Sequence, residues 1–140
     1  MDRQEVCYAS DRASLEPISE FVAERARLAG LDEDRVYEIQ MATDEACTNS
    51  IEHAYDGRSA GEIIVCCFVD GQDFVVRVTD FGHKFDPDLV PMPDISAPLE
   101  ERDIGGLGLF FMRRLVDRIE FTFDPVSGNH VEMRKRRVSA

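Results

Sequence analysis

The segments of this chain that favour β-structure occur as two pairs, each joined by a short turn. The four segments are Glu62–Val69, Asp73–Thr79, Arg118–Asp124 and Asn129–Arg136. Asp70-Gly71 separates the first pair and Pro125–Gly128 the second, and both sequences are typical of hairpin turns. Because strands joined in this way run antiparallel, the order excludes regular β-α-β alternation and predicts a mostly antiparallel sheet.

Helical periodicity accounts for much of the remaining chain. A short strand at Gln4–Ala9 precedes an amphipathic helix at Ser14–Ala29. Asp32 is the expected N-cap of a second helix that runs to about Tyr55, and a third helix is expected at Leu107–Val116. Helices packed on one face of an antiparallel sheet give an α+β fold, a two-layer α/β sandwich.

Size and composition favour one folded domain. The 140 residues are 44% hydrophobic, which suits a single core, and the motifs described below fall between about residues 36 and 134. No apolar run approaches the roughly 20 residues that cross a bilayer. The start, MDRQEVCYASD, lacks the basic and apolar regions of a signal peptide, so a cytoplasmic location is expected.

Charge and cysteine usage exclude further classes. The formal net charge of −12 repels nucleic acid and anionic membranes, so neither is an expected partner. The chain contains no CxxC pair or Cys/His ligand spacing, which argues against structural zinc. The cysteines are therefore expected to be buried, reduced thiols; they are Cys7, Cys47, Cys66 and Cys67. The basic tail Arg134–Arg137 is expected to be a solvated strand end.

The second helix, within VYEIQMATDEACTNSIEHAY, has a packing face and a chemical face. Its small and apolar stripe consists of Val36, Ile39, Thr43, Ala46, Cys47, Ser50 and Ala54. Glu38 and Glu52 are expected on the far side, together with Glu45 and Asn49, which lie one turn apart. A carboxylate and a carboxamide at this spacing can share a hydrated cation such as Mg²⁺. The alternative is that both side chains solvate an exposed face.

The sequence DFGHKFDP places Asp80 at the end of a strand, with Gly82 close behind it. A carboxylate there can accept a hydrogen bond from the exocyclic amine of adenine, and glycine permits close approach of the backbone. The alternative is a strand-end turn in which Asp80 caps backbone N–H groups. Asp80-Phe81-Gly82 also occurs in eukaryotic-type protein kinases, but this chain lacks their glycine loop and catalytic loop.

The sequence GGLGLFFMRRLVD opens the third helix with glycines. Backbone N–H groups at a helix start attract phosphate, and we expect the anion site at Gly105, Gly106, Leu107, Gly108 and Leu109. The alternative is close packing that only glycine permits. Neither a P-loop sequence nor a GxGxxG dinucleotide fingerprint is present.

In this order and spacing, the three motifs resemble the three sequence boxes of the Bergerat ATP-binding fold, shared by gyrase, histidine kinases and mismatch-repair ATPases. DEACTNSIEHAY, followed by DFGHKFDP and GGLGLFFMRRLVD, is most similar to the bacterial anti-sigma factor serine/threonine kinases. The resemblance covers roughly Val36–Arg134. Histidine kinases would require a separate phosphoacceptor domain, which this chain does not contain.

The resemblance implies a role for each matching residue. Glu45 corresponds to the catalytic base and Asn49 to the Mg²⁺ ligand. Asp80, supported by Gly82, corresponds to the adenine-reading aspartate, and the glycine segment to the phosphate loop. The segment His83–Ile104 would be the ATP lid. Members of that family phosphorylate a STAS-type anti-anti-sigma protein, alternatively sequester a sigma factor, and commonly act as homodimers.

The sequence therefore predicts an ATP- and Mg²⁺-dependent protein serine/threonine kinase that acts as an anti-sigma factor in a partner-switching pathway. The competing interpretation is a non-catalytic ATP-binding switch that sequesters a sigma factor or another partner. A metabolic ATPase is disfavoured because no second substrate-binding domain is present. The identity of the partner does not follow from the sequence.

Overall fold

The computed structural model describes residues 3–56, 61–83 and 104–137 of the chain. The elements are β1 (Gln4–Ala9), α1 (Leu15–Leu28), α2 (Glu33–Asn49), β2 (Glu62–Asp70), β3 (Asp73–Asp80), α3 (Ile104–Leu115), β4 (Arg118–Asp124) and β5 (Gly128–Arg136). A 3₁₀ turn, η1 (Arg12–Ser14), precedes α1, and a π-helical turn, η2 (Ser50–Ala54), continues α2. The strands and helices expected from the sequence are confirmed, with small shifts at their ends.

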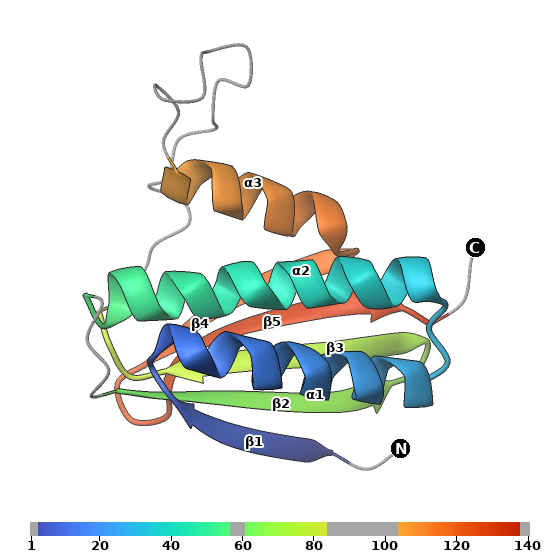
Figure 1. Cartoon of the computed structure of the whole chain (residues 1–140), viewed down its shortest axis with the longest axis horizontal. Helices are drawn as coiled ribbons and strands as arrows, with labels where there is room; N and C mark the ends of the chain where they lie inside the picture. Colours follow the sequence, from blue (N-terminus) through green and yellow to red (C-terminus); the bar gives the residue numbers. More distant parts are fainter. Residues whose placement is uncertain (1–2, 57–60, 84–103, 138–140) are drawn as a thin grey trace.

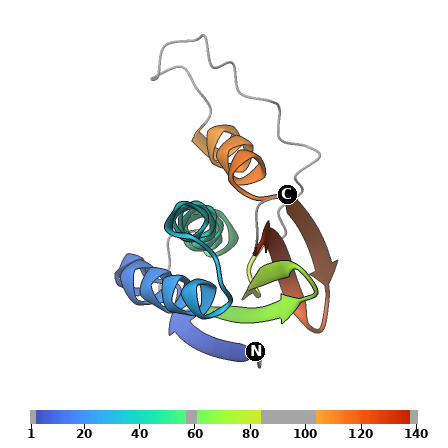
Figure 2. The same cartoon turned by 90° about the vertical axis from the view of Figure 1, so that its right-hand side faces the viewer.

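The five strands form one sheet in the order β1-β2-β3-β5-β4. Every neighbouring pair is antiparallel, including the two predicted hairpins β2–β3 and β4–β5. The three helices lie on the same side of the sheet, with α2 between α1 and α3 (Figures 1 and 2). The predicted two-layer α+β sandwich is therefore confirmed.

The junction between α1 and α2 follows local sequence signals. Gly30 has φ of +96°, a left-handed conformation that glycine adopts without steric cost, and it ends α1. Asp32 then caps α2, because its Oδ1 accepts a hydrogen bond of 2.9 Å from the backbone N–H of Arg35. These two residues reverse the chain within a few positions, so α1 and α2 pack side by side on the sheet.

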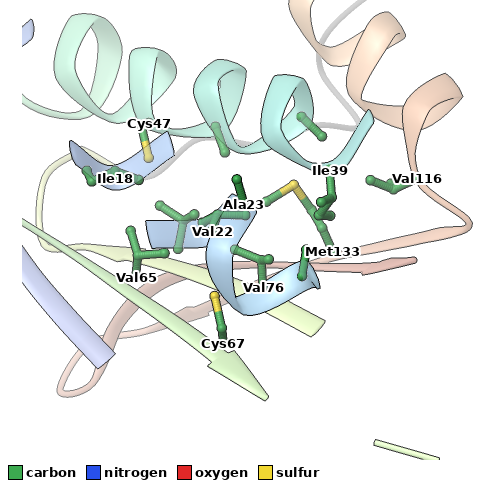
Figure 3. Close-up of a cluster of buried hydrophobic side chains, with 14 of the residues drawn as sticks. Ile18, Val22, Ala23, Ile39, Cys47, Val65, Cys67, Val76, Val116 and Met133 are labelled. Atoms are coloured by element: carbon green, nitrogen blue, oxygen red, sulfur yellow. The ribbon is translucent and has the colours of Figure 1, made fainter. Parts of the chain in front are cut away.

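The core fills the space between the helices and the sheet. All seven residues of the predicted packing stripe on α2 and η2 are buried. Figure 3 shows Ile39 from α2 and Val22 from α1 above Val76 and Met133 of the sheet, and all four are fully buried. Burying such a side chain stabilises the fold by about 1.5–3 kcal/mol. This packing holds α2, which carries the candidate site residues, firmly against the sheet.

The cysteines differ from expectation at one position. All four are free, but Cys7 is exposed while the other three are buried. Val6 and Tyr8 pack towards the core, so Cys7, lying between them on an edge strand, faces away from the helices. Burial raises the pKa of the Cys67 thiol to about 12, which keeps that thiol protonated and inert.

The basic tail is not the solvated strand end that the sequence suggests. Lys135 is only 7% exposed, and its Nζ donates to the carbonyl oxygen of Leu115 at 2.7 Å and contacts Glu38 Oε2 at 3.2 Å. The cation thus meets the last carbonyl groups of α3, where the helix dipole favours positive charge. Successive side chains of β5 point to opposite faces of the sheet, and Lys135 is on the face that the helices cover. A run of basic residues in the sequence does not reveal this contact.

Candidate functional site

An open pocket lies where η2, the end of β3, the strands β4 and β5, and α3 meet. It contains about 410 Å³ of empty space, part of it open to solvent. It is lined by Ala46, Asn49, Ser50, Ala54, Asp80, His83, Met112, Phe121, Phe123, Asn129, His130 and Val131. Apolar walls with a few convergent polar groups are typical of a small-molecule site. The pocket brings together Asn49 and Asp80, two of the residues singled out from the sequence.

The carboxylate of Asp80 accepts three hydrogen bonds within the pocket. Its Oδ2 accepts a hydrogen bond from Ser50 Oγ at 2.7 Å. Its Oδ1 accepts from Asn129 Nδ2 at 2.8 Å and from the Gly82 N–H at 3.2 Å. A carboxylate offers about four acceptor positions, so among the described residues these three donors leave one, on Oδ2. Asp80 is 9% exposed, and the remaining acceptor of its carboxylate suits an N–H group of a base.

Asn129 and Ser50 were not identified as site residues from the sequence. Ser50 was assigned to the packing stripe, and it is indeed buried, but its hydroxyl points at Asp80. The sequence pattern predicts for Asn129 only the start of a strand. The register of β3 and β5 pairs it directly with Asp80, so a correct alignment of these two non-consecutive strands would have revealed it.

Gly82 occupies a position that a larger residue cannot take. A Cβ added there would lie 2.1 Å from the carbonyl oxygen of Ala54, far inside contact distance. The next residue continues this close approach, because the His83 N–H donates to the same oxygen at 2.8 Å. The turn after β3 is therefore pressed against the end of η2.

Glu45 lies on the side of α2 that faces the start of α3. A Cβ built on Gly108 would stand 2.7 Å from Glu45 Oε2, so glycine at this position lets the helix approach the carboxylate. Burial, followed by the charge of Glu52, raises the pKa of Glu45. A carboxylate with a raised pKa is a stronger proton acceptor, the property that a general base requires.

Asn49 is the last residue of α2, immediately before the π-helical turn. Its side chain is partly buried, lines the pocket, and places Nδ2 at 3.8 Å from Met112 Sδ. This contact occupies the amide nitrogen, whereas the amide oxygen is the atom that a cation binds. Single π turns inserted in α-helices occur frequently at functional sites.

The predicted chemical face of α2 is divided in the structure. Glu38 pairs with Lys135 of β5, and Glu52 forms an ion pair with Arg12 of η1. Glu45 and Asn49 therefore remain as the two residues of that face beside the pocket and α3. The four residues share one face of the helix, but different elements contact that face along its length.

The glycine segment lies inside a helix rather than before one. α3 begins at Ile104, so Gly105, Gly106, Leu107, Gly108 and Leu109 all belong to its first turns. The first four N–H groups of an α-helix lack intrahelical partners, whereas those of Gly108 and Leu109 lie beyond them. The side chain of Leu109 is buried, at 4% exposure. Most of the expected lid, from residue 84 to residue 103, lies outside the described residues.

The described part of the site is compatible with Mg²⁺ only as an ion shared with a ligand. Among the residues that the structure describes, no group of three or more His, Cys, Asp or Glu side chains is placed to hold a metal. Mg²⁺ bound with nucleotides needs few protein ligands, since phosphates and waters complete its octahedron. Asn49 is the described residue that suits such a position.

The fold and pocket together define a class: a nucleotide-binding domain with an antiparallel sheet on one side and helices on the other. A family model for the histidine kinase-like ATPase domain matches residues 8–135. The chain belongs to this family, and membership of an ATPase family implies that it uses ATP.

Individual relatives of the chain are named serine-protein kinases. The serine-protein kinase RsbW of Listeria monocytogenes is 34% identical over 103 residues, covering 71% of this chain and 66% of that protein. The serine-protein kinase RsbW of Halalkalibacterium halodurans is 36% identical over 104 residues, covering 71% of this chain and 62% of that protein. The matches thus span slightly less than two thirds of each relative.

Solved structures agree on the fold. The RsbU and RsbW domains of a Mycobacterium tuberculosis protein superpose with a TM-score of 0.69 at 17% identity, covering 97% of this chain and 32% of that chain. The histidine kinase domain of a blue-light activated histidine kinase from Erythrobacter litoralis superposes with a TM-score of 0.54 at 18% identity, covering 89% of this chain and 59% of that one. Within the described residues, no helix is long and apolar enough to span a membrane.

Proposed function

We propose that this chain is an ATP-dependent protein serine/threonine kinase that acts as an anti-sigma factor. Its substrate would be a STAS-type anti-anti-sigma protein in a partner-switching pathway. Relatives named serine-protein kinase RsbW at 34% and 36% identity support the activity. The observation that carries the proposal is the placement of Glu45, a partly buried carboxylate with a raised pKa, directly against the start of α3.

The base end of the proposed site selects adenine. Asp80, held by Ser50 and Asn129, keeps one acceptor position free for the exocyclic amine. Guanine presents a carbonyl oxygen at the corresponding ring position, and two facing acceptors repel each other. The apolar side chains of Met112 and Phe121 line the same pocket and suit the faces of a purine.

The transfer end would use Glu45, Asn49 and the N–H groups at the start of α3. Asn49 would hold Mg²⁺, which offsets phosphate charge when bound. The substrate hydroxyl oxygen forms a bond to the γ-phosphorus, the bond to the β–γ bridging oxygen breaks, and ADP leaves. Glu45 accepts the hydroxyl proton. The N–H groups of Gly105, Gly106 and Leu107 would face the phosphates.

A transfer assay tests the proposal directly. With radiolabelled Mg·ATP and a STAS-domain partner, the wild-type chain should label a serine or threonine of the partner. Glu45→Gln should slow transfer by about 100- to 10,000-fold while the Kd for ADP stays within about twofold, because only the proton acceptor is lost. The matched control is Glu20→Gln on the exposed face of α1, which should transfer normally. ATP binding without any labelling would contradict kinase activity.

One observation favours the second candidate, a non-catalytic nucleotide-binding switch. Among the described residues that line the pocket, none is a lysine or arginine that could meet a γ-phosphate. A switch of this kind would bind and release its partner according to nucleotide state. It would regulate the partner normally with Glu45→Gln, whereas the kinase would not.

Partner, assembly and location are part of the same proposal. The family resemblance favours a homodimer that binds a STAS-domain protein or a sigma factor in the cytoplasm. Four free cysteines are compatible with a reducing compartment. Light scattering and co-purification with each partner test assembly and partner choice separately.

A further inference from the structure

Ala54, the last residue of η2, and the two residues that follow it each contact the turn after β3. The carbonyl oxygen of Ala54 accepts the His83 N–H at 2.8 Å. The hydroxyl of Tyr55 accepts the Phe81 N–H at 2.7 Å. Asp56 Oδ2 lies 2.9 Å from His83 Nε2. Of these contacts, the one made by Tyr55 is the only one that also reaches a third segment of the chain.

The Tyr55 hydroxyl bridges two residues, Glu62 and Phe81, that would form a pair if the β2–β3 register continued. The β2–β3 register pairs Ile64 with Thr79, and two further residues along each strand would pair Glu62 with Phe81. Those two residues are joined instead through the phenol: the Phe81 N–H donates to the hydroxyl, which donates to the Glu62 carbonyl oxygen at 2.7 Å. The β2–β3 ladder therefore ends at the Ile64–Thr79 pair, and the chain after Asp80 leaves the sheet towards the pocket.

Glycine at position 61 makes room for the ring. A Cβ built on Gly61 would lie 2.4 Å from Tyr55 Cε1 and 2.5 Å from Cζ, so any side chain there displaces the ring. Gly61 is itself fixed, because its N–H donates to Ser10 Oγ at 3.0 Å and its carbonyl oxygen accepts the Ser10 N–H at 2.9 Å. Burial raises the pKa of Tyr55, so the hydroxyl keeps the proton that it donates.

The opened turn carries two of the groups that orient Asp80. The Gly82 N–H donates to Asp80 Oδ1 at 3.2 Å, and the Gly82 carbonyl oxygen accepts Asn129 Nδ2 at 3.0 Å. If the turn closed back onto β2, both contacts would be lost, and Asp80 would keep only its bonds from Ser50 and Asn129. We propose that Tyr55 is a positioning residue for base recognition, because its hydroxyl holds the turn in the conformation that presents Asp80 to the base.

The inference rests on nucleotide binding at this pocket but not on phosphoryl transfer. Tyr55→Phe keeps the ring and removes the hydroxyl. By calorimetry, we expect the Kd for ADP to rise about three- to tenfold, as for the loss of one or two hydrogen bonds. The Kd for inosine diphosphate, which lacks the exocyclic amine, should change by less than about twofold. Preference for ADP over inosine diphosphate should therefore fall, a change that general loosening of the fold does not produce.

Two further variants complete the test. Tyr37→Phe changes an exposed tyrosine of α2 in the same way and should leave both Kd values unchanged. Gly61→Ala retains the hydroxyl but displaces the ring, so it should reproduce the loss of preference even if Tyr55→Phe fails to fold. Unchanged affinity for ADP, or an equal loss for both nucleotides, would overturn the role of Tyr55. Failure of the wild-type chain to bind ADP would instead contradict the proposed function.

Discussion

The two ends of the candidate site are built differently. At the base end, Asp80 is nine-tenths buried and receives three hydrogen bonds from three different segments. At the transfer end, Glu45 is partly exposed, and the described contact is a close approach to Gly108. In the proposed site, base recognition would therefore depend on a hydrogen-bond network, whereas phosphoryl transfer would depend on how near α3 stands to α2. Changes at the first end should alter affinity, and changes at the second should alter rate.

The largest expected effect on nucleotide affinity comes from breaking the network at the base end. Asp80→Asn replaces one acceptor oxygen with an NH₂ group, which must face either a neighbouring donor or the amine of the base. The Kd for ADP should rise at least about 100-fold, because a site built for one hydrogen-bond pattern strongly rejects another. Calorimetry with ADP and inosine diphosphate measures this, and the loss should be much smaller for the second nucleotide. Retention of ADP affinity within about threefold would show that Asp80 does not read the base.

A smaller effect should follow at the transfer end. Gly108→Ala places a Cβ against the flexible end of Glu45, so the carboxylate moves aside while the helix gains up to about 1 kcal/mol in propensity. Thermal stability should therefore hold or rise, while the transfer rate falls about tenfold.

The double variant sharpens this prediction. If Gly108→Ala acts through Glu45, then combining it with Glu45→Gln should cost no more than Glu45→Gln alone. Additive losses in the transfer assay would mean that Gly108 acts independently of the carboxylate.

The smallest effect concerns Asp44, whose Oδ1 is buried without a hydrogen-bond partner among the described residues. Burial, and then the charge of Glu45, raises its pKa above the ordinary value of 3.8. The folded protein thus holds this proton to higher pH than the unfolded chain, so ionised Asp44 opposes folding at neutral pH. Asp44→Asn should stabilise the fold at pH 7 by at most about 1 kcal/mol, after allowance for solvent screening.

The pH dependence distinguishes this cause from better packing. The advantage of Asp44→Asn in urea unfolding should shrink as the pH falls through the raised pKa, since the wild-type carboxyl then becomes neutral too. Asp34→Asn removes an exposed carboxylate from the same helix and is the matched control. An advantage that is constant from pH 7 to acid would contradict the electrostatic explanation.

Local signals made most of the fold predictable. Asp70-Gly71 and Asp32 mark their turn and helix start through short-range chemistry, so both were placed correctly from the sequence. The start of α3 was predicted too late because glycine is a poor helix former, and packing against α2 overrides that preference.

The contacts that organise the site were not predictable in the same way. Asn129 meets Asp80 only through the register of two strands that are not consecutive in the chain. Tyr55 reaches Phe81 and Glu62 only because β2 and β3 stop pairing at that point. A sequence motif identifies the residue that is expected to contact a ligand. It does not identify the neighbouring residues that orient that side chain.

β5 contacts both Asp80 and the last residue of α3. Asn129, near its start, holds Asp80, and Lys135, near its end, fixes the last carbonyl of α3. On the ribosome, α2 and β3 emerge well before this strand. The contacts that Asn129 and Lys135 make therefore form only when β5 pairs between β3 and β4, after the first motifs have been made.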